Sequence, residues 1–430
     1  MREKINAALR SDLIKVSSKT GIATAIRIGA SFVISKILAI FVGPSGLAIL
    51  GQLNNASNII QSLSTGGITV GVTKYISEFS DRRESQIKII NTSLKLTFLC
   101  SAICSFGVLM SYKFLGYRLF HSNKYDQILL ILGITLILFS FNSLITAIIN
   151  GLRNFKLYII INISTSLISL ITTLVFVYSL GVYGSLLSLV LSPTLIFFIS
   201  WFLVRKEGWL NYQFFKIPFD RKSLKLLSAF SLMAINNAIV GAIAQIAIRS
   251  LITGKMNIDV AGIWDGMNKL SAGYMLLITT SIQVYYLPTL SFIKDRKLLW
   301  KEIIKTEKII LPLSLLLFTI IFMFRGFIIN MLFSKEFYLM KSIFAYQLLG
   351  DIIKIASWIL SYTMYAKAMA KQLIITDNLF TLIYVFTSYL FMKNLDYGLN
   401  AVYYSYIINN FIYLIFMYFF MKKYTSKIYE

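Results

Sequence analysis

The sequence has little charge. Only 14% of its 430 residues are Asp, Glu, Lys or Arg, against about 25% in a typical soluble domain, whereas 57% are apolar. The mean hydropathy is +0.73, and apolar runs longer than about 18 residues recur along the chain. A soluble enzyme needs a far more polar surface, so this composition excludes one. It predicts an all-α, polytopic membrane protein.

Residues that carry out chemistry are also scarce. His121 is the single histidine, so neither a histidine metal site nor a Ser-His hydrolase can be assembled. No Walker lysine follows a glycine-rich loop, which argues against ATP-driven transport by this chain alone. Cys100 and Cys104 lie in one apolar run and predict no disulfide framework. We therefore expect a protein that is not an enzyme and that holds no cofactor or metal.

Acidic residues are outnumbered by basic ones, 18 against 42, which gives a formal net charge of +24. The basic residues concentrate in alternate short loops between apolar runs, as membrane topology requires, so nucleic acid is not an expected partner. Both ends of the chain are basic, which predicts that both termini are cytoplasmic. The segment Met1–Thr20 is too polar to be a signal peptide.

Breaks between the apolar runs predict twelve spans and two lobes. The longest and most basic break predicts a cytoplasmic linker at 205–225, between an N-terminal six-helix lobe at 1–204 and a C-terminal six-helix lobe at 226–430. Two repeated lobes favour a substrate site in a central cavity and alternating access to it. The spans are 20–43, 47–77, 90–112, 127–150, 157–178, 182–204, 226–252, 258–290, 308–333, 343–366, 372–392 and 399–421.

Charged residues inside the spans are the strongest functional signal. A central Lys or Arg that faced lipid would cost about 2.5–3.5 kcal/mol, so these residues should face a watery cavity or one another. Two pairings within a helix are possible, Asp265 with Lys269 at i,i+4 and Asp351 with Lys354 at i,i+3. Arg249 and Lys269 could instead reach lipid headgroups. The full set is Arg27, Lys36, Arg249, Asp265, Lys269, Asp351, Lys354 and Asp377.

The surplus of cations in this set favours an anionic cargo, and a diphosphate suits Lys and Arg. Several charge-assisted hydrogen bonds, at about 1.5–3 kcal/mol each, are needed to offset its lost hydration. Asp351 and Asp377 would restrain the cations when cargo is absent. Trp358, one turn after Lys354, could stack on a sugar or be an ordinary core or lipid-facing indole. The hypothesised diphosphate site comprises Arg27, Lys36, Arg249 and Lys354.

Several longer motifs carry a family resemblance: Phe41–Leu47, Gly66–Tyr75, Ala261–Trp264, Tyr286–Ser291 and Phe344–Lys354. Through them the chain resembles the Wzx-type flippases of the multidrug/oligosaccharidyl-lipid/polysaccharide exporter superfamily. The resemblance implies a flippase of the bacterial inner membrane. Its cargo would be undecaprenyl-diphosphate-linked oligosaccharide units, such as an O-antigen unit or lipid III of enterobacterial common antigen, moved from the cytoplasmic to the periplasmic leaflet.

The resemblance also implies a cationic central cavity that receives the diphosphate and sugars. It adds Lys74 and Arg153 to the expected binding residues, and Asp265, Lys269, Asp351 and Asp377 remain candidates for charge pairing or ion coupling. Membrane lipid, a polysaccharide polymerase and a chain-length regulator are the expected partners. Two alternatives stay open, a cation-coupled multidrug exporter of the same superfamily and a membrane-embedded glycosyltransferase or polymerase.

Overall fold

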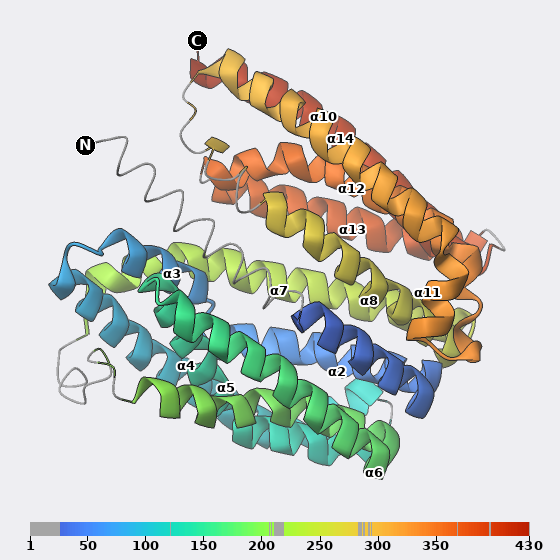
Figure 1. Ribbon diagram of the computed structural model, residues 1–430, viewed down its shortest axis with the longest axis horizontal. Helices are drawn as coiled ribbons and strands as arrows, with labels where there is room; N and C mark the ends of the chain where they lie inside the picture. Colours follow the sequence, from blue (N-terminus) through green and yellow to red (C-terminus); the bar gives the residue numbers. More distant parts are fainter. Residues whose placement is uncertain are drawn as a thin grey trace. The chain divides into compact units, whose positions relative to one another are not determined.

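The computed structural model describes residues 26–120, 122–205, 207, 209, 219–282, 286, 289–290, 293, 295–367, 369–394 and 397–429. Helices account for nearly all of these residues, and no strand occurs among them (Figure 1). The expectations made for Met1–Thr20 and His121 lie outside the described residues. So do most of the 205–225 linker and half of the Tyr286–Ser291 motif.

The chain divides into two compact units. The first comprises Met1–Val42 and Gln52–Ile239, and the second comprises Gly43–Gly51 and Val240–Glu430. Of the three boundaries, one lies at the start of α2 (Gly43–Ser64), one inside α2 and one inside α7 (Arg221–Lys255). A division by contacts does not test which segments form the lobes of a membrane protein, so lobes at 1–204 and 226–430 stay a prediction.

The first unit is built around α5 (Asp126–Gly151), which packs against α3 (Thr69–Glu78), α4 (Arg83–Phe120) and α6 (Phe155–Val204). A further helix covers residues 26–41, and the short helix η1 (Asn123–Tyr125) leads into α5. Gly66 and Gly67, both with φ of 64°, end α2 in the left-handed conformation that glycine adopts readily. Ile68, Val72 and Ile148 are fully buried and join α3 to α5.

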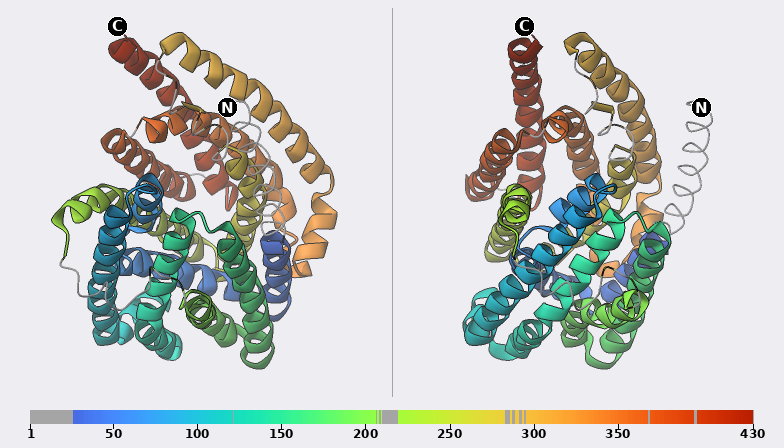
Figure 2. Two further views of the ribbon diagram at one scale, coloured as in Figure 1. Left: turned by 60° about the vertical axis from the view of Figure 1, so that its left-hand side comes forward. Right: turned by 90° about the vertical axis from the view of Figure 1, so that its left-hand side faces the viewer.

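Helix α6 consists of two helical halves, and the chain turns back between them at Gly181, where φ is 55° and ψ is −127°. The break lies between the predicted spans 157–178 and 182–204, which run side by side as the two halves of α6 (Figures 1 and 2). The hydroxyls of Thr172 and Ser192 join the halves at 2.6 Å. A side chain at Gly184 would overlap the carbonyl oxygen of Phe176, so only glycine permits this close approach.

The second unit is built around α12 (Met340–Ala366), which packs against α8 (Ile258–Ser281), α10 (Arg296–Met323), α13 (Ala370–Asn394) and α14 (Asn400–Tyr429). Figure 2 separates α10 from α14, which overlap in Figure 1. The shorter helices α11 (Arg325–Leu332) and η5 (Lys335–Phe337) connect α10 to α12.

Side-chain caps start several of these helices where the sequence supplies Asn or Asp. Asn257 accepts a hydrogen bond from the Val260 amide at the start of α8, and Asp295 accepts one from the Leu298 amide at the start of α10. At the start of α7, Asp220 accepts hydrogen bonds from the Ser223 hydroxyl and amide, at 2.5 and 2.9 Å. These bonds lower the pKa of Asp220.

Eight helices within the described part of the chain are long and apolar enough to cross a membrane. They are α4, α5 with η1, α6, α7, α10, α12, α13 and α14, and α6 alone covers two predicted spans. Helices α2 and α8 also match predicted spans but carry many polar residues, among them Asn54 and Asn55 in α2 and Asp265 in α8. These helices confirm the prediction of an all-α, polytopic membrane protein.

Close packing of the start of α2 on α8 can be tested at Gly262. A methyl group there would overlap the carbonyl oxygen of Pro44, a backbone atom that cannot rotate away. Overpacking of this kind costs about 1–3 kcal/mol, and we expect Gly262→Ala to lower the unfolding temperature in detergent. Gly241→Ala is the matched control, because nothing lies within 4 Å of its added methyl group. It should leave stability unchanged or slightly raised. Equal unfolding temperatures for the two variants would contradict the packing.

Candidate functional site

A bidentate salt bridge joins α7 to α8 inside the second unit. Arg249 Nε lies 2.6 Å from Asp265 Oδ2, and Arg249 Nη2 lies 2.7 Å from Asp265 Oδ1. Both side chains are buried, at 5% and 7% exposure. Asp265 thus pairs across helices with Arg249 and not with Lys269 of its own helix. The planar guanidinium explains the choice, because it offers two parallel donors to one carboxylate and an ammonium cannot.

Glycine at position 51 allows α2 to pass this salt bridge. A Cβ atom at Gly51 would lie 2.8 Å from Arg249 Nη2 and 2.8 Å from Asp265 Oδ2. The Arg249 guanidinium carbon also lies 5.7 Å from the centre of the Trp264 ring, within range of a cation–π interaction. The ion pair is therefore enclosed by an aromatic ring and by backbone.

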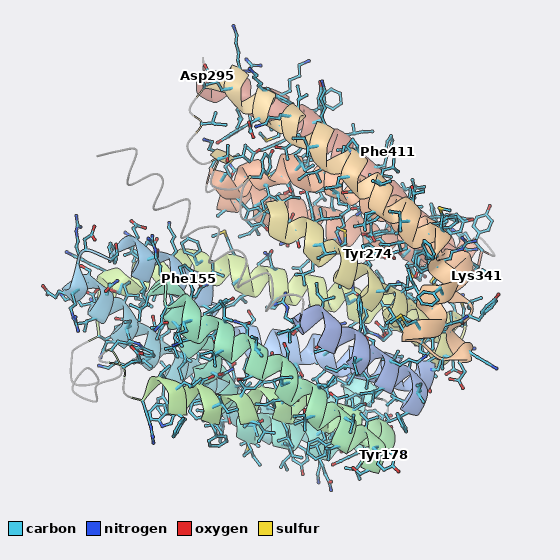
Figure 3. The ribbon with its side chains drawn as sticks, in the orientation of Figure 1. Phe155, Tyr178, Tyr274, Asp295, Lys341 and Phe411 are labelled. Atoms are coloured by element: carbon cyan, nitrogen blue, oxygen red, sulfur yellow. The ribbon has the colours of Figure 1, made fainter. Side chains whose placement is uncertain are left out.

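Asp351 on α12 is 1% exposed and accepts hydrogen bonds from four neutral side chains. Oδ2 accepts from the hydroxyls of Ser271 and Tyr274, at 2.7 and 2.5 Å. Oδ1 accepts from the hydroxyl of Tyr406 at 2.8 Å, and Gln347 Nε2 lies 3.1 Å from both oxygens. Figure 3 labels Tyr274 on α8. The carboxylate is stabilised by dipoles from α8, α12 and α14, and no cation in the described part of the chain forms a salt bridge with it.

Sequence reasoning missed these four donors. Ser271 and Tyr274 lie three residues apart on α8, and Gln347 lies one turn before Asp351 on α12, so each pair occupies one helix face. Polar residues at helical spacing within two predicted spans were the available signal. Tyr406 gave none, because it is one of 25 tyrosines.

Lys354 does not pair with Asp351, although the i,i+3 spacing allowed it. Its ammonium lies 5.0 Å from the centre of the Trp358 ring and 5.6 Å from the centre of the Tyr406 ring. Among the described residues, no carboxylate lies within salt-bridge distance of this ammonium. The cation lies against aromatic rings and forms no salt bridge within the described ranges.

Lys354 and Trp358 line a cavity of about 340 Å³ that lies wholly within the second unit. Its wall combines aromatic rings, amide groups and hydroxyls. Of the described residues that line it, Lys354 is the one with a charge. The lining residues are Gln245, Trp264, Asn268, Ser271, Ala272, Met275, Leu276, Thr279, Gln347, Lys354, Trp358, Tyr384, Tyr403 and Tyr406.

Lys269 and Asp377, the two other charged residues predicted in this unit, lie apart from these contacts. Both are half-buried, and neither forms a salt bridge with a described residue. Asp377 on α13 faces Tyr413. Restraint of cations by Asp351 and Asp377 in the absence of cargo stays a prediction; among the described in-span charges, the salt bridge joins Arg249 to Asp265.

The remaining predicted cations belong to the first unit. Arg27 is exposed and Lys36 is half-buried on the helix at 26–41. The Lys74 ammonium lies 4.9 Å from the Tyr75 ring centre and 5.0 Å from that of Phe230. A single cluster of Arg27, Lys36, Arg249 and Lys354 would draw on both units and stays a prediction.

Arg153 is brought close to α3. Its Nε donates to the hydroxyl of Ser77 at 3.2 Å, and Ser77 lies three residues after Lys74 on the same helix face. Arg153 has a φ of 57°, which is uncommon for a residue other than glycine. The structure thus places two exposed cations, Lys74 and Arg153, at one end of α3.

The fold of the chain matches solved membrane transporters. A multidrug resistance MATE family transporter of the MOP superfamily, solved in an inward-facing conformation, matches with a TM-score of 0.78 at 16% identity, over 94% of this chain and 98% of that one. A MOP superfamily transporter from Pyrococcus furiosus matches with a TM-score of 0.69 at 15% identity, over 97% and 96%. The chain therefore shares its fold with these two transporters.

Residues 15–294 match the family described as "Polysaccharide biosynthesis protein", and the chain belongs to that family. It is also similar to the lipid III flippase of Escherichia coli (strain K12), with 29% identity over 380 residues, which are 88% of this chain and 91% of the relative. The resemblance inferred from the motifs is confirmed.

The contribution of the Arg249–Asp265 salt bridge to the stability of the protein can be tested by mutation. Removal of one partner leaves a buried charge unpaired, which costs about 3–5 kcal/mol. We expect Arg249→Gln and Asp265→Asn each to lower the unfolding temperature strongly in detergent, and the double variant to lose much less than the sum. Glu84→Gln is the matched control, because the Glu84–Lys88 pair is equally short, at 2.6 Å, but exposed. It should not change stability measurably. Additive losses in the double variant would show that the two side chains act separately.

Proposed function

We propose that this chain is a flippase for undecaprenyl-diphosphate-linked oligosaccharide units, carrying them from the cytoplasmic to the periplasmic leaflet of the inner membrane. Family membership is the observation that carries the proposal, and the 29% identity to a lipid III flippase over 88% of the chain supports it. An O-antigen unit or lipid III is the cargo we propose. The working form has twelve spans in two six-helix lobes, with both termini cytoplasmic.

The chemistry of the cavity in the second unit supports an anionic, sugar-containing cargo. Lys354 is the charged residue of its described lining, and it has no carboxylate partner among the described residues. The wall also offers amide and hydroxyl groups beside aromatic rings, as ligands with many hydroxyls require. The undecaprenyl tail needs no such site, because it can remain in lipid while the polar head crosses.

Export of cationic drugs is the second candidate, and the likeness to a multidrug resistance transporter favours it. A cavity that binds cations should present carboxylates. Asp351 lies behind the wall and already accepts hydrogen bonds from four side chains. The charge of the lining therefore favours the flippase over the drug exporter. A polysaccharide polymerase and a chain-length regulator are the partners that we propose for the flippase.

Complementation tests the function directly. The gene for this chain is expressed in strains that lack their own flippase and accumulate a defined lipid-linked glycan on the cytoplasmic side. We expect one class of glycan to reach the periplasm, measured as polymerised product or by its labelling with a periplasmic enzyme. Drug resistance gained in the same strains without any glycan export would contradict the flippase and support the exporter.

The predicted cations can be tested for cargo binding by Gln variants. We expect Arg27→Gln, Lys36→Gln and Lys354→Gln each to reduce glycan export about tenfold, because one charge-assisted hydrogen bond contributes roughly 1.5–3 kcal/mol. Arg249 is left out, because its loss would leave Asp265 unpaired. Lys341→Gln is the control, since Lys341 is exposed on the same helix as Lys354. Normal export in all three variants at equal membrane levels would refute a role for these cations in binding the cargo.

A further inference from the structure

The cavity in the second unit contains hydrogen-bond donors that the described residues leave unsatisfied. The buried amide nitrogen of Asn268 and the hydroxyl of Tyr403 have no hydrogen-bond partner, and both residues line the cavity. The ammonium of Lys354 forms no salt bridge with a described residue. Because buried polar groups in proteins are nearly always paired, these two unsatisfied donors and the cation that lines the same cavity point to a ligand rich in acceptor oxygens.

The wall of the cavity has the character of a sugar-binding surface. Five aromatic residues, Trp264, Trp358, Tyr384, Tyr403 and Tyr406, contribute to it. A pyranose has an apolar face that packs on such rings and a rim of hydroxyls that reach amides. Tyr406 is fixed by its hydrogen bond to Asp351, so part of the wall is rigid before any ligand enters.

The charge and the volume of the cavity further restrict the class of ligand that it can bind. Lys354 supplies one positive charge, and the carboxylate of Asp351 is already occupied by its four donors. One cation matches a ligand of one negative charge, whereas a diphosphate would need several. The volume of about 340 Å³ is near the lower limit of ligand pockets, which suits a single sugar residue better than a whole repeat unit.

We propose that this cavity is a saccharide subsite selective for a sugar residue with a single carboxylate, that is, a hexuronate. Its carboxylate accepts from Lys354, its apolar face packs on Trp358, and its remaining oxygens accept from Asn268 and Tyr403. The subsite rests on the proposed function, because the hexuronate is taken to be one residue of the transported oligosaccharide. It assigns Lys354 to the sugar and leaves the diphosphate to other cations.

Ligand binding to the purified full-length protein in nanodiscs tests the subsite. The probes are methyl glucuronide, methyl glucoside and glucose 1-phosphate, followed by tryptophan fluorescence and calorimetry. We expect the glucuronide to bind about tenfold or more tightly than the glucoside, in line with one charge-assisted hydrogen bond. Lys354→Gln should abolish this preference, and Lys354→Arg should keep it. Trp358→Leu should weaken both sugars.

Lys341→Gln is the matched control for the lysine variants. Lys341 lies on the same helix, and its ammonium is 5.3 Å from the centre of the Tyr338 ring, much as that of Lys354 lies over Trp358. It precedes Lys354 by thirteen residues, about 20 Å along the helix, and Figure 3 labels it near the start of α12. The glucuronide preference should be unchanged in this variant.

Several results would overturn the subsite. They are equal affinity of the wild type for glucuronide and glucoside, a preference that survives in Lys354→Gln, tighter binding of glucose 1-phosphate than of glucuronide, or no saturable binding of any probe. The complementation experiment distinguishes failure of the saccharide subsite from failure of the proposed flippase function. Export of glycans without a glucuronide preference would retain the flippase and remove the subsite. A glucuronide preference without export would retain the subsite and remove the flippase.

Discussion

The second unit depends on one physical constraint, that a charge inside an apolar helix bundle must be stabilised by a partner. An unpaired buried ion would cost several kcal/mol, a large part of the stability of a domain. Arg249 and Asp265 meet the constraint with two parallel hydrogen bonds, and their geometry fixes α7 relative to α8. It also fixes the residue at position 51, because any side chain there would enter the ion pair.

Asp351 meets the same constraint in a different way. Four neutral donors from three helices surround its carboxylate, so the charge is spread over hydroxyl and amide dipoles and not cancelled by a cation. Lys354, one turn away, is consequently not consumed by a structural salt bridge. Its position over Trp358 and Tyr406 keeps the charge inside the bundle at a modest cost and available to a ligand.

The sequence predicted the positions of the helices better than the contacts that their charged side chains make. Apolar runs located the helices, and the gap left between 178 and 182 coincides with the non-helical Gly181. The charged residues within the spans could be singled out from the sequence, but the spacing of Asp265 and Lys269 suggested a pairing within one helix. Helical periodicity describes neighbours on one helix only, and Arg249 reaches Asp265 from another.

The residues that line the cavity were even harder to predict from the sequence than the partners of the charged residues. Asn268 and Tyr403 are ordinary residues for a chain rich in Asn and Tyr, and nothing in their spacing indicates that they end beside one cavity. Their unsatisfied donors are visible only once three helices are packed together. Tertiary contacts of this kind have no local sequence signal.

The turn at Gly181 bears on how the topology of this membrane protein can be mapped. The two halves of α6 meet without an intervening loop, with Phe176 and Gly184 in close approach and Thr172 bonded to Ser192. An epitope or fluorescent domain inserted there would have to push the two halves apart instead of extending from a loop. A reporter domain at this position should therefore be fused to a chain that is truncated there. A reporter inserted into the full-length chain would disrupt the packing of the two halves, and its signal would not give the native topology.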